Sequence, residues 1–109
     1  MGIEGEKFAI SRDCLIDLDK QTVQRRGLVY RLSYTQFRIL EILLAHLNCP
    51  VSTDEIIRYT SNMQATITLG TLYVYVYRLR ARIEEDPRHP KLLLCIGDRR
   101  YMMHNVQHR

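Results

Sequence analysis

The sequence has few cysteines and no long apolar run, and these two shortages limit the classes of protein it can represent. Its three cysteines stand far apart, and no signal-peptide pattern precedes them: Cys14, Cys49 and Cys95. Small secreted domains instead carry an even set of paired cysteines, so we expect a reduced, cytoplasmic chain. The most apolar run, residues 39–47, contains Glu41 and His46 and is too short to cross a bilayer. We therefore expect no contact with a membrane.

The groupings of residues that mark catalytic and metal sites are also missing. No Gly-rich phosphate loop, nucleophile elbow or Ser/His/Asp grouping can be assembled, so we expect no enzyme, no small-molecule substrate and no cofactor. His46 and Cys49 lie three positions apart, but no second close-spaced pair completes a zinc site, and we predict no metal. The three acids at 84–86 precede Pro87. We interpret them as the solvated end of a helix rather than as a cation site.

The length of the chain limits the number of domains, and its positive charge indicates a polyanionic partner. A chain of 109 residues has room for one domain, which we place at residues 8–104, between a flexible N-terminus (1–7) and a tail (105–109). The formal net charge is +4, and thirteen of the sixteen basic residues are arginine. Arginine is the cation suited to bidentate contacts with phosphate and guanine, so this composition favours a nucleic acid.

Residues 68–85 are predicted to form one amphipathic helix with two distinct sides. An apolar stripe recurs at steps of three and four: Leu69, Leu72, Val76, Leu79 and Ile83. The opposite side carries Gly70, Thr71, Val74, Tyr77, Arg78, Ala81 and Glu85. The two edges between these sides are the shoulders of the helix. Arg80 and Tyr73 lie on one shoulder, and Arg82 and Tyr75 lie on the other. This helix alone fits either a partner-binding surface or a partly buried helix whose tyrosines pack at its margins.

The residues before this helix predict an antiparallel sheet and two capped helices. Alternating apolar residues from Phe8 to Leu32 indicate three or four short strands, with turns at 19–20 and 25–27 and the buried positions Cys14, Ile16, Leu18, Val23, Leu28, Tyr30 and Leu32. A capping box at 33–36 starts a helix that should end at Asn48, before Pro50. Ser52 and Glu55 repeat the capping pattern and start a shorter helix through about Thr60.

The residues after the helix predict a β-hairpin. Apolar segments at 92–96 and 101–104 are separated by Gly97-Asp98-Arg99-Arg100, which favours a turn at Gly97 with both arginines at its tip. The resulting order is the α+β layout of a winged helix-turn-helix: an N-terminal antiparallel sheet, three helices and a C-terminal hairpin wing.

The sequence also resembles the DNA-binding effector domain of OmpR/PhoB-type response regulators of two-component systems, from about Phe8 onward. The resemblance rests on Leu-Ser-x-x-Gln-Phe at 32–37, Val-Ser-x-x-Glu-Ile at 51–56, Arg-Leu-Arg-x-Arg-Ile-Glu at 78–84, Asp-Pro-Arg-His-Pro at 86–90 and Tyr101. It implies transcription regulation by sequence-specific binding of double-stranded DNA. The helix at 68–85 would lie in the major groove and the wing, residues 95–103, at the adjacent minor groove.

The resemblance also implies roles for particular residues. Arg78 matches an arginine that reads bases, Val74 matches a valine that meets a thymine methyl group, and Arg80 and Arg82 would lie near phosphates. The predicted DNA-binding set is Thr71, Val74, Tyr75, Tyr77, Arg78, Arg80, Arg82, Arg99 and Arg100. Relatives often contact RNA polymerase with the loop that corresponds here to Asn62, Met63, Gln64, Ala65 and Thr66, and they commonly bind tandem half-sites in pairs.

The chain departs from the family pattern on the helix and in the wing. Many relatives have, in order, a charged residue, an acidic or amide residue, a histidine, another basic residue and a lysine where this chain carries Gly70, Tyr73, Tyr75, Tyr77 and Ala81. The family's Arg-Gly-x-Gly-Tyr wing is here Gly97-Asp98-Arg99-Arg100-Tyr101. Base preference should therefore differ. The alternative function is a winged-helix module that has lost DNA binding and docks a protein through its Tyr/Arg-rich helix. The receiver domain that usually precedes such a module is not in the sequence, which fits an excised domain or a stand-alone regulator.

Overall fold

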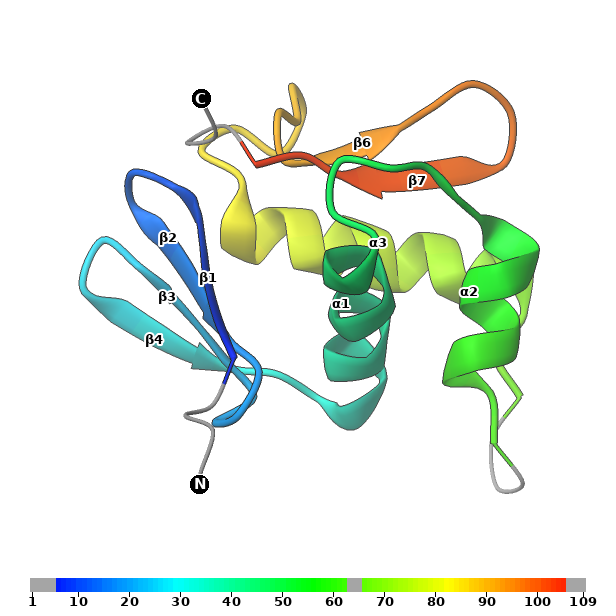
Figure 1. Ribbon diagram of the computed structural model, residues 1–109, viewed down its shortest axis with the longest axis horizontal. Coiled ribbons are helices and arrows are strands. Elements are labelled where there is room, and N and C mark those ends of the chain that lie inside the picture. Colours follow the sequence, from blue (N-terminus) through cyan, green and yellow to red (C-terminus); the bar gives the residue numbers. More distant parts are fainter. Residues whose placement is uncertain (1–5, 63–65, 106–109) are drawn as a thin grey trace.

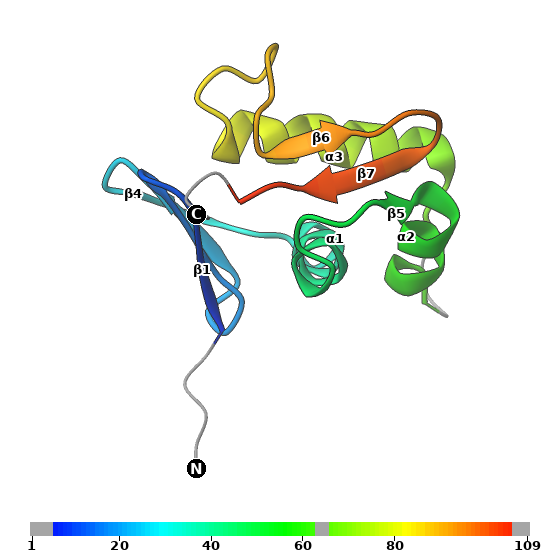
Figure 2. The ribbon, with the colours of Figure 1, turned by 45° about the horizontal axis from the view of Figure 1, so that its top comes forward.

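The computed structural model describes residues 6–62 and 66–105, and the predicted α+β order is confirmed there. A four-stranded sheet lies beside the helices, and a second sheet runs along the third helix (Figures 1 and 2). In chain order the elements are β1 (Lys7–Ser11), β2 (Cys14–Asp17), β3 (Thr22–Arg25), β4 (Leu28–Arg31), α1 (Tyr34–Ala45), β5 (Val51–Ser52), α2 (Thr53–Thr60), α3 (Leu69–Ile83), β6 (Leu93–Cys95) and β7 (Arg100–Met103).

The N-terminal sheet is an antiparallel meander in the order β1-β2-β3-β4. Its inner face buries Ile10, Ile16 and Val23 completely. At the turn between β3 and β4, which the sequence predicts at 25–27, Arg26 and Gly27 have φ of 52° and 82°. The predicted burial of Leu28 is wrong, because its side chain is 59% exposed. Leu28 directly follows this turn, at one end of an edge strand.

Helix α1 begins with the predicted capping box. The Gln36 N–H donates to the Ser33 hydroxyl at 3.2 Å, and the Ser33 N–H donates to the Gln36 side chain at 2.9 Å. The helix ends at Ala45, earlier than predicted, because the His46 N–H bonds to the Leu43 carbonyl and tightens the last turn. Asn48, the predicted helix end, takes a left-handed conformation with φ of 64°. The helical period therefore stops before the apolar pattern does.

Helix α2 is capped as predicted, and one arginine joins it to α1. The Glu55 N–H donates to the Ser52 hydroxyl at 3.1 Å. The Arg38 guanidinium lies 4.0 Å from the Tyr59 ring centroid and donates to the Tyr59 carbonyl and hydroxyl, while the Tyr59 hydroxyl donates to Glu41 at 2.7 Å. The angle between the two helices is thus held by polar contacts as well as by the core.

The C-terminal sheet contains a strand that the sequence analysis missed. Its order is β5-β7-β6, so Val51 pairs with Tyr101 on one side of β7 and Leu93 pairs with Met103 on the other. The short β5 directly precedes α2 and ties the wing to the start of that helix. None of the described helices is long and apolar enough to cross a membrane.

Candidate nucleic-acid interface

Helix α3 presents the two sides that its sequence predicts. Leu72, Val76, Leu79 and Ile83 are buried and Leu69 packs at the edge of the core. All seven residues predicted for the outward side are exposed. The stripe buries one side of the helix in the core and leaves the other open along its length.

The start of α3 is set by a hydroxyl cap. The Thr71 N–H donates to the Thr68 hydroxyl at 3.1 Å, and the two threonine hydroxyl oxygens lie 2.9 Å apart. The Thr71 hydroxyl thus takes part in the cap and keeps further hydrogen-bonding capacity. The structure leaves the side chain exposed, as predicted.

The middle of the outward side is aromatic and aliphatic. Tyr77 is 71% exposed, and Val74 is 46% exposed. Tyr73 is also 46% exposed, so three large side chains of α3 keep contact with water. Tyr75 differs from them, because it is half-buried and packs against the core, as the alternative of tyrosines packing at the helix margins predicts.

Arg78 is the charged group at the edge of this surface. Its guanidinium lies 6.0 Å from the Tyr75 ring centroid, one turn earlier on α3. Among the described residues no hydrogen bond or ion pair engages Arg78. All five of its N–H donors are therefore available to a ligand.

The two shoulder arginines are held by different sheets. The Arg80 Nε donates to the Leu93 carbonyl at 3.0 Å, and its guanidinium lies 5.9 Å from the Tyr101 ring centroid. The Arg82 guanidinium lies 4.2 Å from the ring centroid of Tyr30 on β4. Arg80 thus connects α3 to the wing in addition to any role toward phosphates, and this structural role was not predicted.

The wing carries its two arginines at and beside the turn that contains Gly97. Gly97 lies in the turn with φ of 59°, as predicted, and Arg99 has the same φ. Arg100 is the first residue of β7, pairs with Ser52 and accepts from the Ile96 N–H. The backbone of Arg100 therefore belongs to the strand, but its Nη2 lies 3.3 Å from the position that a Cβ would take on Gly97, so the guanidinium reaches back to the tip. Both side chains are nevertheless exposed.

The end of α3 was also predicted wrongly, because Glu84 is not solvated. Its carboxylate is 2% exposed and accepts from the N–H groups of Lys91, Leu92 and Leu93, with the shortest contact 2.7 Å. The backbone leaves the helix at Glu84, so α3 ends at Ile83 rather than at 85. Glu84 thereby fixes the segment that leads into β6.

Nothing in the spacing of the three acids distinguished Glu84 from its neighbours. The available signal was indirect: a segment that enters a buried strand has backbone N–H groups that need acceptors. The acceptor for these N–H groups is determined by the path of the chain back along α3. This path is part of the tertiary structure, so the local sequence does not reveal it.

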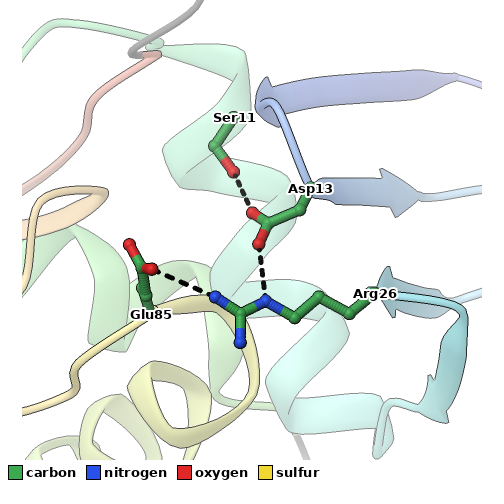
Figure 3. A network of polar contacts seen from close by, with 4 residues as sticks. All are labelled: Ser11, Asp13, Arg26 and Glu85. Atoms are coloured by element: carbon green, nitrogen blue, oxygen red, sulfur yellow. Dashed lines mark hydrogen bonds and ion pairs between the residues drawn. The ribbon is translucent and has the colours of Figure 1, made fainter.

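A second polar network joins the N-terminal sheet to the same end of α3 (Figure 3). Arg26 donates through Nε to Asp13 at 2.9 Å and through Nη2 to Glu85 at 3.0 Å, and the Ser11 hydroxyl donates to Asp13 at 3.1 Å. The hydrogen bond from Arg26 is the main reason why the pKa of Asp13 lies below its ordinary value. Arg26 and Glu85 are exposed and the other two residues are half-buried, so water and salt weaken the contribution of the network.

The three cysteines are unpaired, and the described residues include no metal-binding group. Burial raises the pKa of the Cys14 thiol to about 12, which keeps it protonated. Cys49 and Cys95 are exposed and free. Within residues 6–62 and 66–105, no group of three or more His, Cys, Asp or Glu side chains is placed to hold a metal ion.

The loop before α3 is described only at its ends. Asn62 and Thr66 are exposed. Met63, Gln64 and Ala65, the other members of the predicted polymerase-contact loop, lie outside the described residues.

Comparisons with known proteins agree with this geometry. Residues 27–103 match the family model described as "Transcriptional regulatory protein, C terminal". The chain is 34% identical over 93 residues to the response regulator protein GraR of Staphylococcus aureus (strain Newman), a match that covers 85% of this chain and 41% of GraR. The chain thus spans about two fifths of the length of that relative.

Solved structures share the fold at lower identity. The response regulator DrrB of Thermotoga maritima, an OmpR/PhoB homologue, superposes with a TM-score of 0.78 at 22% identity, over 90% of this chain and 44% of DrrB. The DNA-binding domain of RstA from Klebsiella pneumoniae, solved in complex with the RstA box, gives a TM-score of 0.71 at 17% identity, over 92% of this chain and 98% of that domain.

Proposed function

The chain belongs to the family of C-terminal domains of transcriptional regulatory proteins, and we propose that it binds double-stranded DNA in a sequence-specific manner. The outward side of α3 enters the major groove, where Arg78 contacts a guanine edge and Val74 and Tyr77 contact base methyl groups. The hairpin β6–β7 reaches the adjacent minor groove with Arg99 and Arg100. The family is a class of regulators, not of enzymes.

The observation that carries this proposal is the difference in burial between the two sides of α3. One side packs in the core from Leu72 to Ile83, while the other side exposes Val74, Tyr77 and Arg78, which no hydrogen bond or ion pair engages among the described residues. A helix held rigidly by one side can place side chains of the other side against base edges. A guanidinium without an internal partner is the group that most often reads guanine.

The shoulders of α3 complete the surface. Arg80 and Arg82 flank the outward side, where the two phosphate backbones border the major groove, and Arg99 and Arg100 extend the positive charge over the wing. Thr71 and Tyr75 lie beside them on α3. Phosphate contacts of this kind fix register and orientation, and they supply affinity that falls steeply with salt.

A selection from random duplexes tests the proposal. The chain should enrich one short motif, and its affinity for that motif should fall by orders of magnitude between low and moderately high salt. Enrichment of no motif, together with weak dependence on salt, would contradict DNA reading and favour the protein-docking alternative. The tyrosines and arginines of α3 would then form the docking surface.

Pairing on DNA is part of the proposal. One module of this size buries little DNA surface, so two copies on tandem half-sites about ten to eleven base pairs apart should bind cooperatively. Equal affinity per half-site for single and tandem duplexes would exclude this arrangement. The test requires the selected motif as one isolated copy and as two copies in phase and half a turn out of phase.

We also propose that the loop at 62–66 contacts RNA polymerase. The proposal rests on the position of the loop directly before α3 and on the exposure of Asn62 and Thr66. Replacing both residues with alanine should leave DNA affinity unchanged and reduce activation in a transcription reaction with purified polymerase. Unchanged activation would contradict the contact.

A further inference from the structure

Tyr30 of the N-terminal sheet lies under an arginine of α3, although the two residues are far apart in the sequence. The Arg82 guanidinium is 4.2 Å from the Tyr30 ring centroid. The Tyr30 side chain is half-buried, and that of Arg82 is exposed. At this distance the positive charge is attracted to the negative face of the ring.

The ring restricts Arg82 without using its hydrogen-bond donors. Among the described residues no hydrogen bond or ion pair engages Arg82. A guanidinium that lies against a ring keeps its N–H groups free in its own plane. An arginine side chain loses much rotamer freedom when it binds a ligand, and a stack that orders it beforehand reduces this loss.

The neighbouring arginines show what is particular to this pair. The Nε of Arg80 is already bound to the Leu93 carbonyl. The Arg78 guanidinium lies 6.0 Å from the ring of Tyr75, within its own helix. Arg82 combines free donors with a close aromatic support from another element, on the shoulder of α3 that borders the N-terminal sheet.

We infer that Tyr30 is a positioning residue that orients Arg82 for a bidentate contact with a DNA phosphate. The N-terminal sheet thereby takes part in DNA binding without touching a base. This inference rests on the proposed function, since it concerns the phosphate contacts of the same surface. Arginine forks match phosphate oxygens, so an ordered guanidinium at this shoulder binds the backbone with little dependence on sequence.

A double-mutant cycle tests the inference, with affinities measured on a selected duplex and on a scrambled one at several salt concentrations. Arg82→Ala should weaken binding to both duplexes and flatten the slope of log affinity against log salt by about one unit, the value for one phosphate. Tyr30→Leu should weaken binding to both by about two- to fivefold, the scale of a cation–π contact. Tyr30→Phe, which retains the ring, should restore wild-type affinity.

The decisive measurement is Tyr30→Leu in the Arg82→Ala background. There it should have no further effect on binding, because the group that Tyr30 orients is gone. As a matched control, Arg31→Ala removes an exposed arginine from the same strand, and its effect should be independent of Arg82. In the free protein, NMR should show ring-current shifts of the Arg82 δ-protons that Tyr30→Leu abolishes and Tyr30→Phe retains.

The outcomes distinguish failure of the inference alone from failure of the proposed function. If Tyr30→Leu weakens binding equally with and without Arg82, Tyr30 acts through the fold and the inference fails. Unchanged binding by Tyr30→Leu also overturns it, while the selected motif still supports DNA reading. A wild-type chain that binds neither duplex overturns the proposed function and the inference together. Thermal unfolding of every variant identifies any that fails to fold. If Tyr30→Leu does, the ring-current shifts of the Arg82 δ-protons in the folded wild-type and Tyr30→Phe chains carry the test, and their absence overturns the inference.

Discussion

Arg78 lies in the C-terminal half of α3 and Glu84 directly follows its last residue, yet their charges meet opposite surroundings. The Glu84 carboxylate is buried and accepts from three backbone N–H groups. The Arg78 guanidinium is exposed, and among the described residues no hydrogen bond or ion pair engages it. One charge is satisfied by the fold and the other is left for a partner.

The difference indicates how to separate structural from functional charges on one helix. A buried charge is tolerated only when the protein supplies its hydrogen bonds, so removing it should cost stability. An exposed charge without an internal partner adds little to stability, so removing it should change only binding. Charges with intermediate burial and partners should fall between these two limits.

The largest effect on stability is expected for Glu84→Ala. The substitution leaves three N–H groups of the segment before and within β6 without an acceptor, two of them in buried residues, and should cost about 3 kcal/mol or more. Urea unfolding followed by circular dichroism measures the loss. The neighbouring Glu85→Gln is the matched control and should barely move the midpoint. A small effect at Glu84 would mean that water replaces its carboxylate.

A smaller effect is expected for the cap of α2. Ser52→Ala removes the acceptor for the Glu55 N–H and should cost about 1 kcal/mol. Ser52→Asp, which retains an acceptor, should lose less. An unchanged unfolding midpoint in the alanine variant would contradict a stabilising role for this hydroxyl.

The smallest effect is expected for the exposed network at Asp13. Its folded-state pKa is depressed, chiefly by the hydrogen bond from Arg26, so its contribution is present above the unfolded-state pKa of about 3.9 and is lost as pH falls through the folded-state pKa. Asp13→Asn should therefore be slightly less stable than wild type at pH 7. The difference should shrink below about pH 4 and respond to salt. A large or pH-independent difference would contradict this assignment.

Features coded within a few residues were predictable from the sequence. The caps at Ser33 and Ser52 depend on bonds across three positions, and the positive φ of Asn48 and Gly97 depends on residue type. The stripe of α3 and the α+β order followed from apolar periodicity, and the resemblance to OmpR/PhoB-type effector domains was confirmed by the family match. These signals are local, so they survive without knowledge of the tertiary structure.

Features that depend on distant parts of the chain were missed. Glu84 was assigned to solvent because its partners are backbone groups that reach it only when the chain returns toward β6. The strand β5 is too short to show a period, and Leu28 alternates correctly but lies at an uncovered end of its sheet. Arg80 was assigned to phosphates alone because its bond to the Leu93 carbonyl requires the wing to lie along α3.

The contrast between Arg78 and the wing arginines tests the central claim, that the outward side of α3 reads bases. Arg78→Ala and the double variant Arg99→Ala/Arg100→Ala should each retain the stability of the wild type. Their affinities are to be measured on a selected duplex and on a scrambled one of equal length, at several salt concentrations. The double variant should weaken binding to both duplexes alike and flatten the slope of log affinity against log salt by about one to two units.

Arg78→Ala should behave differently from the double variant. It should cost about 1 to 3 kcal/mol on the selected duplex, relax preference at one base pair and change affinity for the scrambled duplex far less. Equal weakening of the two duplexes by Arg78→Ala, or no change in either, would contradict base reading by α3.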